Sequence, residues 1–442
     1  MLMAQHWPRR LLPCFVLSAA LNWATPADLP AELSLSQALS LALSNNNVIR
    51  EAMAHLDQAS GQYQQARSAL LPQLDVSARQ NFQTVNLIGI GIDLPSASGL
   101  IGPFGSMDAR ASLSQDIFNL ASVRAWQSYR SRRDSARLLA DDSREIVALN
   151  VVATYLEALR AKATRDTLAQ QATLAGDLYK LTRDRVSQGI AAELDANRAM
   201  QKVNTLEQQT QQASQDYIAA KLKLANILQA RITSDFEVAD AQAYGSAAAL
   251  NRDAAIQTAL ATRADYRAAE AVVKAAELQL KSVKASRLPI LGMSFSDGQS
   301  GNTPVHNVNT YKVQGSIEFP LYTGGRIRGQ VEEAEGSLRE STARLDRDRS
   351  QIETDVLTAI SGVEWALKQV ETSGRNVKLS REEVEFTRSR FAQGIADNTE
   401  VVNAQDRLTQ ADEAQIGAQY MLGLARANLA RATGAAEKTY RK

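Results

Sequence analysis

The chain has 442 residues, of which 45% are hydrophobic and only 5% aromatic, and its formal net charge is +1. This composition favours long helices with narrow apolar seams over one thick globular core. The near-neutral charge, with no basic cluster interleaved with aromatic residues, argues against a nucleic-acid partner.

The N-terminus has the pattern of an export signal. Arg9 and Arg10 precede an apolar run at 11–20, and small residues suited to cleavage follow. This pattern predicts a signal peptide over residues 1–27. A short membrane anchor is the alternative, but the apolar run is too short to span a bilayer. Cys14, the only cysteine of the chain, lies inside this segment.

The chain is duplicated over almost its whole length. Similar segments recur at 42–74 and 259–291, and again at 185–191 and 390–396. A period this long is not that of a solenoid. It predicts a first structural repeat over 28–250 and a second over 251–442.

Each repeat contains a pair of strands, at about 73–118 and about 290–322. Apolar and polar residues alternate there over about ten residues, with loops expected around Pro103 and His306. This is the pattern of an outer-membrane barrel strand, although a soluble hairpin with one wet face has the same alternation. No later segment is apolar enough for a membrane helix, so we expect any membrane entry to use strands.

Between the strand pairs the sequence predicts very long helices. Residues 121–186 and 326–391 contain no proline and keep a helical apolar period, so each would extend roughly 100 Å unbroken. Shorter helices return in two pairs, and we expect each pair to be stacked end to end: 191–229 with 252–286, and 396–431 with 36–70. Their joins, at about 230–250 and at the chain ends, should form a belt midway along the body.

Four strands per chain cannot close a barrel, because unpaired strand edges are costly in lipid. Two, three or four copies would supply eight, twelve or sixteen strands. The residues alone leave these numbers open.

The long helices turn back at two tips, about 185–195 and about 390–400. Gly189 and Gly394 stand where the helices end, and glycine is the usual left-handed residue there. Asp195 and Glu400 suit the first turn of the returning helices. A plain helix–turn–helix corner accounts for both glycines without a partner.

No enzyme, cofactor or metal site is expected. The three histidines are dispersed, at His6, His55 and His306, and no thiol is available outside the signal. No nucleophile elbow or phosphate-binding loop is present. The rival class is a periplasmic coiled-coil adaptor or scaffold, which would not need duplicated strand pairs. A porin-like channel would be rich in strands throughout.

The duplication and six motifs, in this order, resemble the TolC-type outer-membrane efflux duct family. They are the duplication, the Leu-Pro entries at 71–72 and 288–289, the strand exits at 117–118 and 321–326, and the tip motifs Arg185…Gly189…Asp195 and Arg390…Gly394…Glu400. The resemblance implies a homotrimer in which two β-hairpins per chain build one shared 12-stranded transmembrane barrel. Very long antiparallel helices would continue it as a coiled-coil-like tunnel.

The resemblance also implies partners and a location. The duct would cross the outer membrane, contact its lipid and extend into the periplasm. Its tip would dock on a periplasmic adaptor protein that connects it to an inner-membrane transporter. It would serve as the passive exit duct of a drug, metal or type I secretion system, and the sequence does not reveal the cargo.

The tip residues take their expected roles from this resemblance. The residues implied for adaptor docking are Arg185, Gly189, Asp195, Arg390 and Gly394, and those implied for the periplasmic entrance or gate are Phe391, Glu400 and Asn403.

This chain departs from the family pattern at the second tip. The family often has aspartates six and nine residues after the glycine, where this chain has Glu400 and Asn403. It also often has a tyrosine and an arginine where Phe391 and Ala396 stand. We therefore expect Glu400 to line the constriction and closure to rest on the packing of Phe391.

Overall fold

The computed structural model describes residues 29–91, 99–233, 235–239, 251–303 and 305–441. The expected signal peptide at 1–27 lies outside these residues, as does most of the expected join at 230–250. The helices are α1 (Leu35–Asn45), α2 (Asn47–Ser68), α3 (Leu120–Ser187), α4 (Glu193–Ile227), α5 (Arg252–Thr262), α6 (Ala264–Ala285), α7 (Arg326–Ala392), α8 (Asn398–Ala432) and α9 (Ala436–Tyr440). The strands are β1 (Glu32–Leu33), β2 (Gln73–Asn86), β3 (Leu100–Phe118), β4 (Glu237–Val238), β5 (Ile290–Gly301) and β6 (Asn307–Glu318), with a short 3₁₀ helix at Ile88–Ile90.

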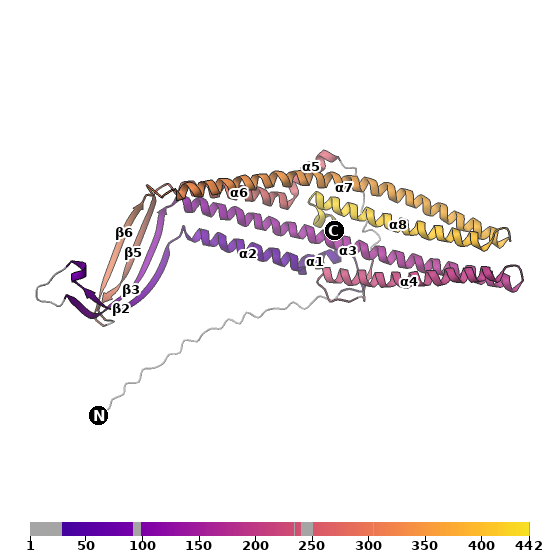
Figure 1. Ribbon diagram of the computed structural model, residues 1–442, viewed down its shortest axis with the longest axis horizontal. Coiled ribbons are helices and arrows are strands. Elements are labelled where there is room, and N and C mark those ends of the chain that lie inside the picture. Colours follow the sequence, from indigo (N-terminus) through magenta and orange to yellow (C-terminus); the bar gives the residue numbers. More distant parts are fainter. Residues whose placement is uncertain (1–28, 92–98, 234, 240–250, 304, 442) are drawn as a thin grey trace, which may run out of the picture.

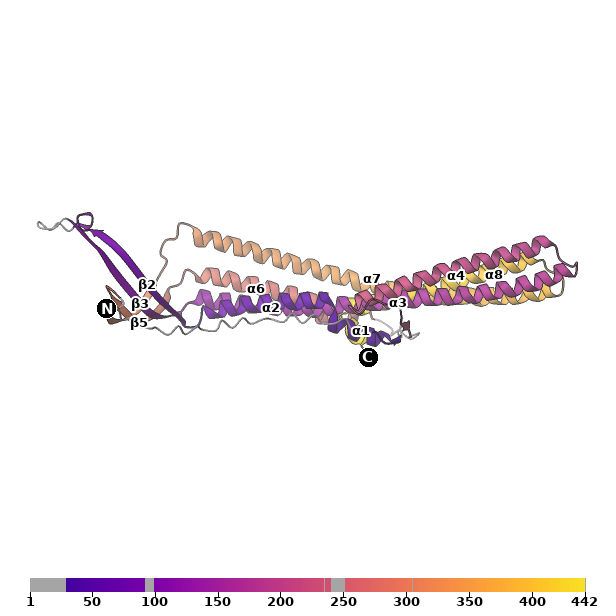
Figure 2. The same cartoon turned by 90° about the horizontal axis from the view of Figure 1, so that it is seen from below.

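Two unbroken helices run the length of the helical body. α3 has 68 residues and α7 has 67, which confirms the prediction of two long uninterrupted segments. At 1.5 Å per residue each is roughly 100 Å long. They connect the sheet at one end to helix corners at the other (Figures 1 and 2). Of the helices described, none combines the length and apolarity that crossing a membrane requires.

The two return helices next to the sheet, expected at 36–70 and 252–286, are each broken once, where continuous helices were expected. Asn46 separates α1 from α2 and Arg263 separates α5 from α6, both with extended backbone. The Asn46 side chain accepts a hydrogen bond from the N–H of Val48, which caps α2. Arg263 pairs instead with Asp265, at 2.6 Å. The two breaks occupy equivalent places in the repeats.

The expected stacking of the return helices is wrong. Asn46 Nδ2 donates to the carbonyl of Ile227 at 3.0 Å, so α2 begins where α4 ends. Thr262 Oγ1 donates to the carbonyl of Thr433 at 2.7 Å, so α6 begins where α8 ends. The return helices are therefore stacked within each repeat: α2 is in line with α4, and α6 is in line with α8 (Figure 1). Helix lengths alone could not distinguish this pairing from the predicted one, which joined 191–229 to 252–286 and 396–431 to 36–70.

The four long strands form one antiparallel sheet in the order β2-β3-β5-β6. The strands have 14, 19, 12 and 12 residues, which is longer than the ten expected. Pro103 lies inside β3 and not in a loop, so the β2–β3 hairpin extends beyond the rest of the sheet.

The register separates apolar from polar residues onto opposite faces of this sheet. One row of directly paired residues is Leu74, Leu113, Phe295 and Val313. The adjacent row is Asp75, Ser112, Ser296 and Lys312. Since paired residues share a face and successive residues alternate, the predicted amphipathic strands are confirmed.

The elements keep one lateral order at every level of the molecule. Beside the sheet, α2 packs on α3, α3 on α6 and α6 on α7. Toward the corners the order is α4, α3, α8 and α7. The chain is thus a long strip with β2, α2 and α4 along one edge and β6 and α7 along the other.

A belt of short elements crosses the middle of the strip. β1 pairs in parallel with β4, and the Tyr155 hydroxyl in mid-α3 donates to the carbonyl of Leu33 at 2.9 Å. Tyr155 is fully buried in the largest apolar core of the described residues. The described parts of the joins therefore lie midway along the strip.

Candidate functional site

The two tips are closed by the same backbone motif. At the first tip, the N–H of Ile190 donates to the carbonyl of Arg185 at 2.9 Å and that of Gly189 to Val186 at 2.9 Å. At the second, Ile395 donates to Arg390 at 2.9 Å and Gly394 to Phe391 at 3.0 Å. This is the Schellman arrangement, which satisfies the last carbonyls of a helix.

The glycines at the tips are required by backbone conformation. Gly189 has φ 72° and Gly394 has φ 75°, values that side chains disfavour. A Cβ added to either would meet no other atom within 4 Å. Both glycines therefore face open space at the end of the molecule, as a corner accessible to a partner would.

Arg185 reaches from the first tip to the second. Its Nη2 donates to the carbonyl of Ala392 at the end of α7, at 2.8 Å. Its Cζ lies 4.5 Å from the centre of the Phe391 ring. The cation thus meets both an aromatic face and the negative end of a long helix, each of which attracts it.

Phe391 is buried between the two helical hairpins. It is 4% exposed and packs in a small cluster with Leu178 of α3 and Val401 of α8. Ala396 packs against the same cluster. An apolar contact thus occupies the place that the family pattern gives to polar side chains.

Arg390 and Glu400 form an ion pair within the second tip, with 3.1 Å between Nη1 and Oε2. At the first tip the equivalent residues are Arg185 and Asp195, but Arg185 is engaged with α7. The first tip is instead bridged by Arg183 and Glu193, at 2.6 Å. Arg185 and Arg390 therefore occupy equivalent positions in the two repeats but bind different partners.

Asn398 joins the tips and is not among the residues predicted for the site. It is 2% exposed, and its Nδ2 donates to the backbone carbonyl of Asp195 at 2.9 Å. Its Oδ1 lies 3.5 Å from the buried hydroxyl of Thr182. Nothing in the local tip motif indicates this role, because the partner residues are about two hundred positions away. Asn403, by contrast, is exposed on α8.

Large apolar side chains are exposed around both corners. Ile190 is 67% exposed, Ile395 63% and Leu194 58%. Such residues at the far end of a rod-like body provide an apolar surface on which another protein can pack.

On the sheet side of the tips, polar contacts connect the α3–α4 hairpin to the α7–α8 hairpin. Lys202 of α4 forms an ion pair with Asp406 of α8. Gln171 of α3 donates to Asp412 of α8 at 3.1 Å. Burial raises the pKa of Asp412 above its ordinary value, because the positive charge of Arg381 and the hydrogen bond from neutral Gln171 only partly compensate the lost hydration.

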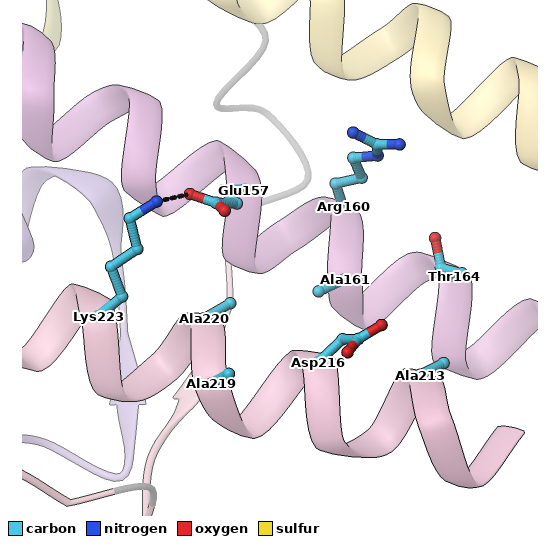
Figure 3. A pocket seen from close by; sticks show the side chains of 9 residues that line it. All are labelled: Glu157, Arg160, Ala161, Thr164, Ala213, Asp216, Ala219, Ala220 and Lys223. Carbon is cyan, nitrogen blue, oxygen red and sulfur yellow. Dashed lines mark hydrogen bonds and ion pairs between the residues drawn. The ribbon is translucent and has the colours of Figure 1, made fainter.

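A cavity of about 460 Å³ lies between α3 and α4 near the belt (Figure 3). Alanines form its floor, and Glu157 and Lys223 form an ion pair at 2.6 Å on its rim. Within the described ranges, no group of three or more His, Cys, Asp or Glu side chains is placed to hold a metal ion.

Comparisons with known proteins agree with this architecture. A family model described as outer membrane efflux protein matches residues 38–229 and 255–435. The pyoverdine export outer membrane protein OpmQ of Pseudomonas putida is 27% identical over 86% of this chain and 80% of its own length. The outer membrane protein TolC of Vibrio cholerae is 24% identical over 93% of this chain and 92% of its own length.

Solved structures of channels have the same fold. The outer membrane protein VceC of Vibrio cholerae superposes with a TM-score of 0.79 at 18% identity, over 91% of this chain and 96% of that one. The open state of the MtrE outer membrane channel of Neisseria gonorrhoeae gives 0.77 at 17% identity, over 92% and 90%. The family match decides against a periplasmic scaffold. The chain therefore belongs to the outer membrane efflux protein family and is an outer-membrane efflux duct.

Proposed function

We propose that three copies of this chain assemble edge to edge into one duct with a shared 12-stranded barrel. The observation that carries this proposal is the constant lateral order of the strip. Its two edges, β2-α2-α4 and β6-α7, each lack a neighbour on their outer side within the described chain. Edge strands with unpaired backbone groups require a partner in lipid, and a second copy supplies it.

The free face of α7 supports the same assembly. Trp365, Leu379 and Phe386 are spaced by multiples of seven and are 57%, 62% and 66% exposed. A heptad stripe of this kind fits a helix of a neighbouring copy. On the opposite edge, Met53 of α2 and Met200 of α4 are 48% and 40% exposed.

The oligomeric state of detergent-extracted outer membranes tests this assembly. We expect a heat-sensitive trimer that forms pores in planar bilayers. Because the only cysteine is Cys14, cysteines introduced singly and pairwise at Ser77 of β2 and Gln314 of β6 would report edge contacts. Crosslinks between copies in the pair but not in either single variant support the barrel. A monomer without conductance would refute it.

We further propose that the tips dock the helical hairpin of a periplasmic adaptor, which links the duct to an inner-membrane transporter. The open corners at Gly189 and Gly394, with Ile190 and Ile395 exposed beside them, support this surface. Arg185, Asp195 and Arg390 would fix the corners that the adaptor meets, while Phe391, Glu400 and Asn403 would shape the entrance.

Polar substitution of the exposed isoleucines tests docking separately from pore formation. The double variant Ile190→Ser and Ile395→Ser should retain conductance in bilayers but lose export of a fluorescent dye in cells. Leu181→Ser, an exposed site on α3 away from the corner turn, is the matched control. Full export by the double variant would exclude these side chains from the docking surface.

A further inference from the structure

The charged residues of the sheet gather on one face. The polar face carries Asp75, Arg79, Asp108, Arg110, Asp116, Lys312 and Glu318. On the opposite face of the four long strands, Asp297 is the one charged residue among those described. In the trimeric barrel proposed above, on which this inference rests, the charged face would line the lumen.

The charges on this face are also sorted along the strands. Asp75, Asp116 and Glu318 lie within three residues of the strand ends that join the helices. Arg79, Arg110 and Lys312 lie at least six residues from those ends. The acidic side chains therefore lie beside the helical body, and the basic ones lie toward the far end of the sheet.

The carboxylate of Asp108 lies among these basic side chains, but it is already paired with one of them. Asp108 receives two hydrogen bonds from Arg110, both at 2.5 Å. Gly298 lies directly opposite Arg110, and a Cβ there would come within 2.4 Å of the Arg110 Cα. Close approach of the strands at this glycine fixes the Arg110 backbone, and Arg79 and Lys312 remain exposed.

We propose that the lumen of this duct contains two belts of opposite charge. The acidic belt, next to the helices, consists of Asp75, Asp116 and Glu318. The basic belt, farther out, consists of Arg79 and Lys312, with Arg110 paired to Asp108 among them, and it binds small anions and anionic solutes as they leave. Three copies would repeat each belt threefold around the pore. Opposed belts select ions of opposite sign at the two ends, so the current depends on the direction of the applied voltage.

Ion selectivity of single pores tests the two belts. In a KCl gradient of roughly 10 against 100 mM the Debye length is about 30 to 10 Å, so fixed charges act across the lumen. The double variant Arg79→Gln and Lys312→Gln should lower the chloride-to-potassium permeability ratio by about twofold or more, from the Coulomb energy of charges several ångströms from the ion. The double variant Asp116→Asn and Glu318→Gln should raise the ratio, and both variants should reduce the asymmetry of the current.

Asp297→Asn is the matched control, because it removes a charge from the same sheet on the opposite face. It should leave the ratio unchanged. At about 1 M salt, where screening acts within about 3 Å, the differences between variants should vanish. Pores whose ratios do not change in either double variant, or change in the same direction, would overturn the belts alone. Absence of pores from the unaltered protein would overturn the trimeric duct itself.

Discussion

The guanidinium of Arg185, at the end of α3, lies over the ring of Phe391, near the end of α7, with 4.5 Å between Cζ and the ring centre. The same guanidinium donates to the carbonyl of Ala392. One side chain therefore connects the two hairpin tips without a carboxylate.

Arg185→Ala should loosen the contact between the two tips. Loss of the charged hydrogen bond and the cation–π contact removes about 1–2 kcal/mol, which corresponds to roughly tenfold more frequent opening. Single-channel recording would detect this as a larger open fraction. Arg183→Ala, which breaks an exposed ion pair at the same corner, should have little effect. Equal open fractions in the two variants would show that Arg185 does not hold the tips together.

Glu400→Gln should weaken block of the pore current by added cations, if Glu400 lines the constriction. The substitution leaves one neutral side chain of the same size beside Arg390, so the local charge becomes more positive. Titration of single-channel current with a divalent cation would measure the block. Glu193→Gln removes a carboxylate from the other tip and should change the block less. An unaltered block in Glu400→Gln would remove this residue from the gate.

Gly189→Ala and Gly394→Ala should each lower stability by about 1 kcal/mol or more, because alanine disfavours positive φ. The effect is conformational, since no atom obstructs the added methyl group. Gly394→Asn should cost less, as asparagine tolerates this region. Gly176→Ala, inside α3, also meets no obstruction and should stabilise by about 0.5–1 kcal/mol. Thermal denaturation midpoints of the purified protein would rank the four variants.

Asp412→Asn should stabilise the contact between α3 and α8 at neutral pH. The folded-state pKa of Asp412 is raised, so the folded protein binds more protons than the unfolded chain just above pH 4. Stability from this group is therefore greatest at low pH and falls as the pH rises through the folded pKa. Denaturation of both proteins across this range would show their difference shrinking on acidification. Asp406→Asn, which leaves Lys202 unpaired, should destabilise at neutral pH instead.

Asn46→Ala should destabilise the belt by about 1–2 kcal/mol, because it removes a helix cap and the hydrogen bond to Ile227. Asn47→Ala breaks only exposed contacts, with Gln229 and Arg50, and should cost less. Hydrogen exchange at the start of α2 would compare them. Equal protection in the two variants would mean that the stacking of α2 on α4 does not depend on Asn46.

The sequence by itself determined the features that depend on near neighbours in the chain. Uninterrupted apolar periodicity specified the two long helices, alternation specified the faces of the sheet, and Gly189 and Gly394 marked the corners. These patterns are local because helix and strand periods, and the φ of a glycine, are properties of a few consecutive residues.

Only the tertiary structure decided which distant segments meet. Equal lengths permitted two ways of stacking the return helices, and the contact of Asn46 with Ile227 selected the one within each repeat. Arg185 pairs with α7, although its counterpart Arg390 pairs within its own tip. A long flexible side chain can reach several partners, and the choice among them depends on the packing of whole helices. Local sequence carries no record of that packing.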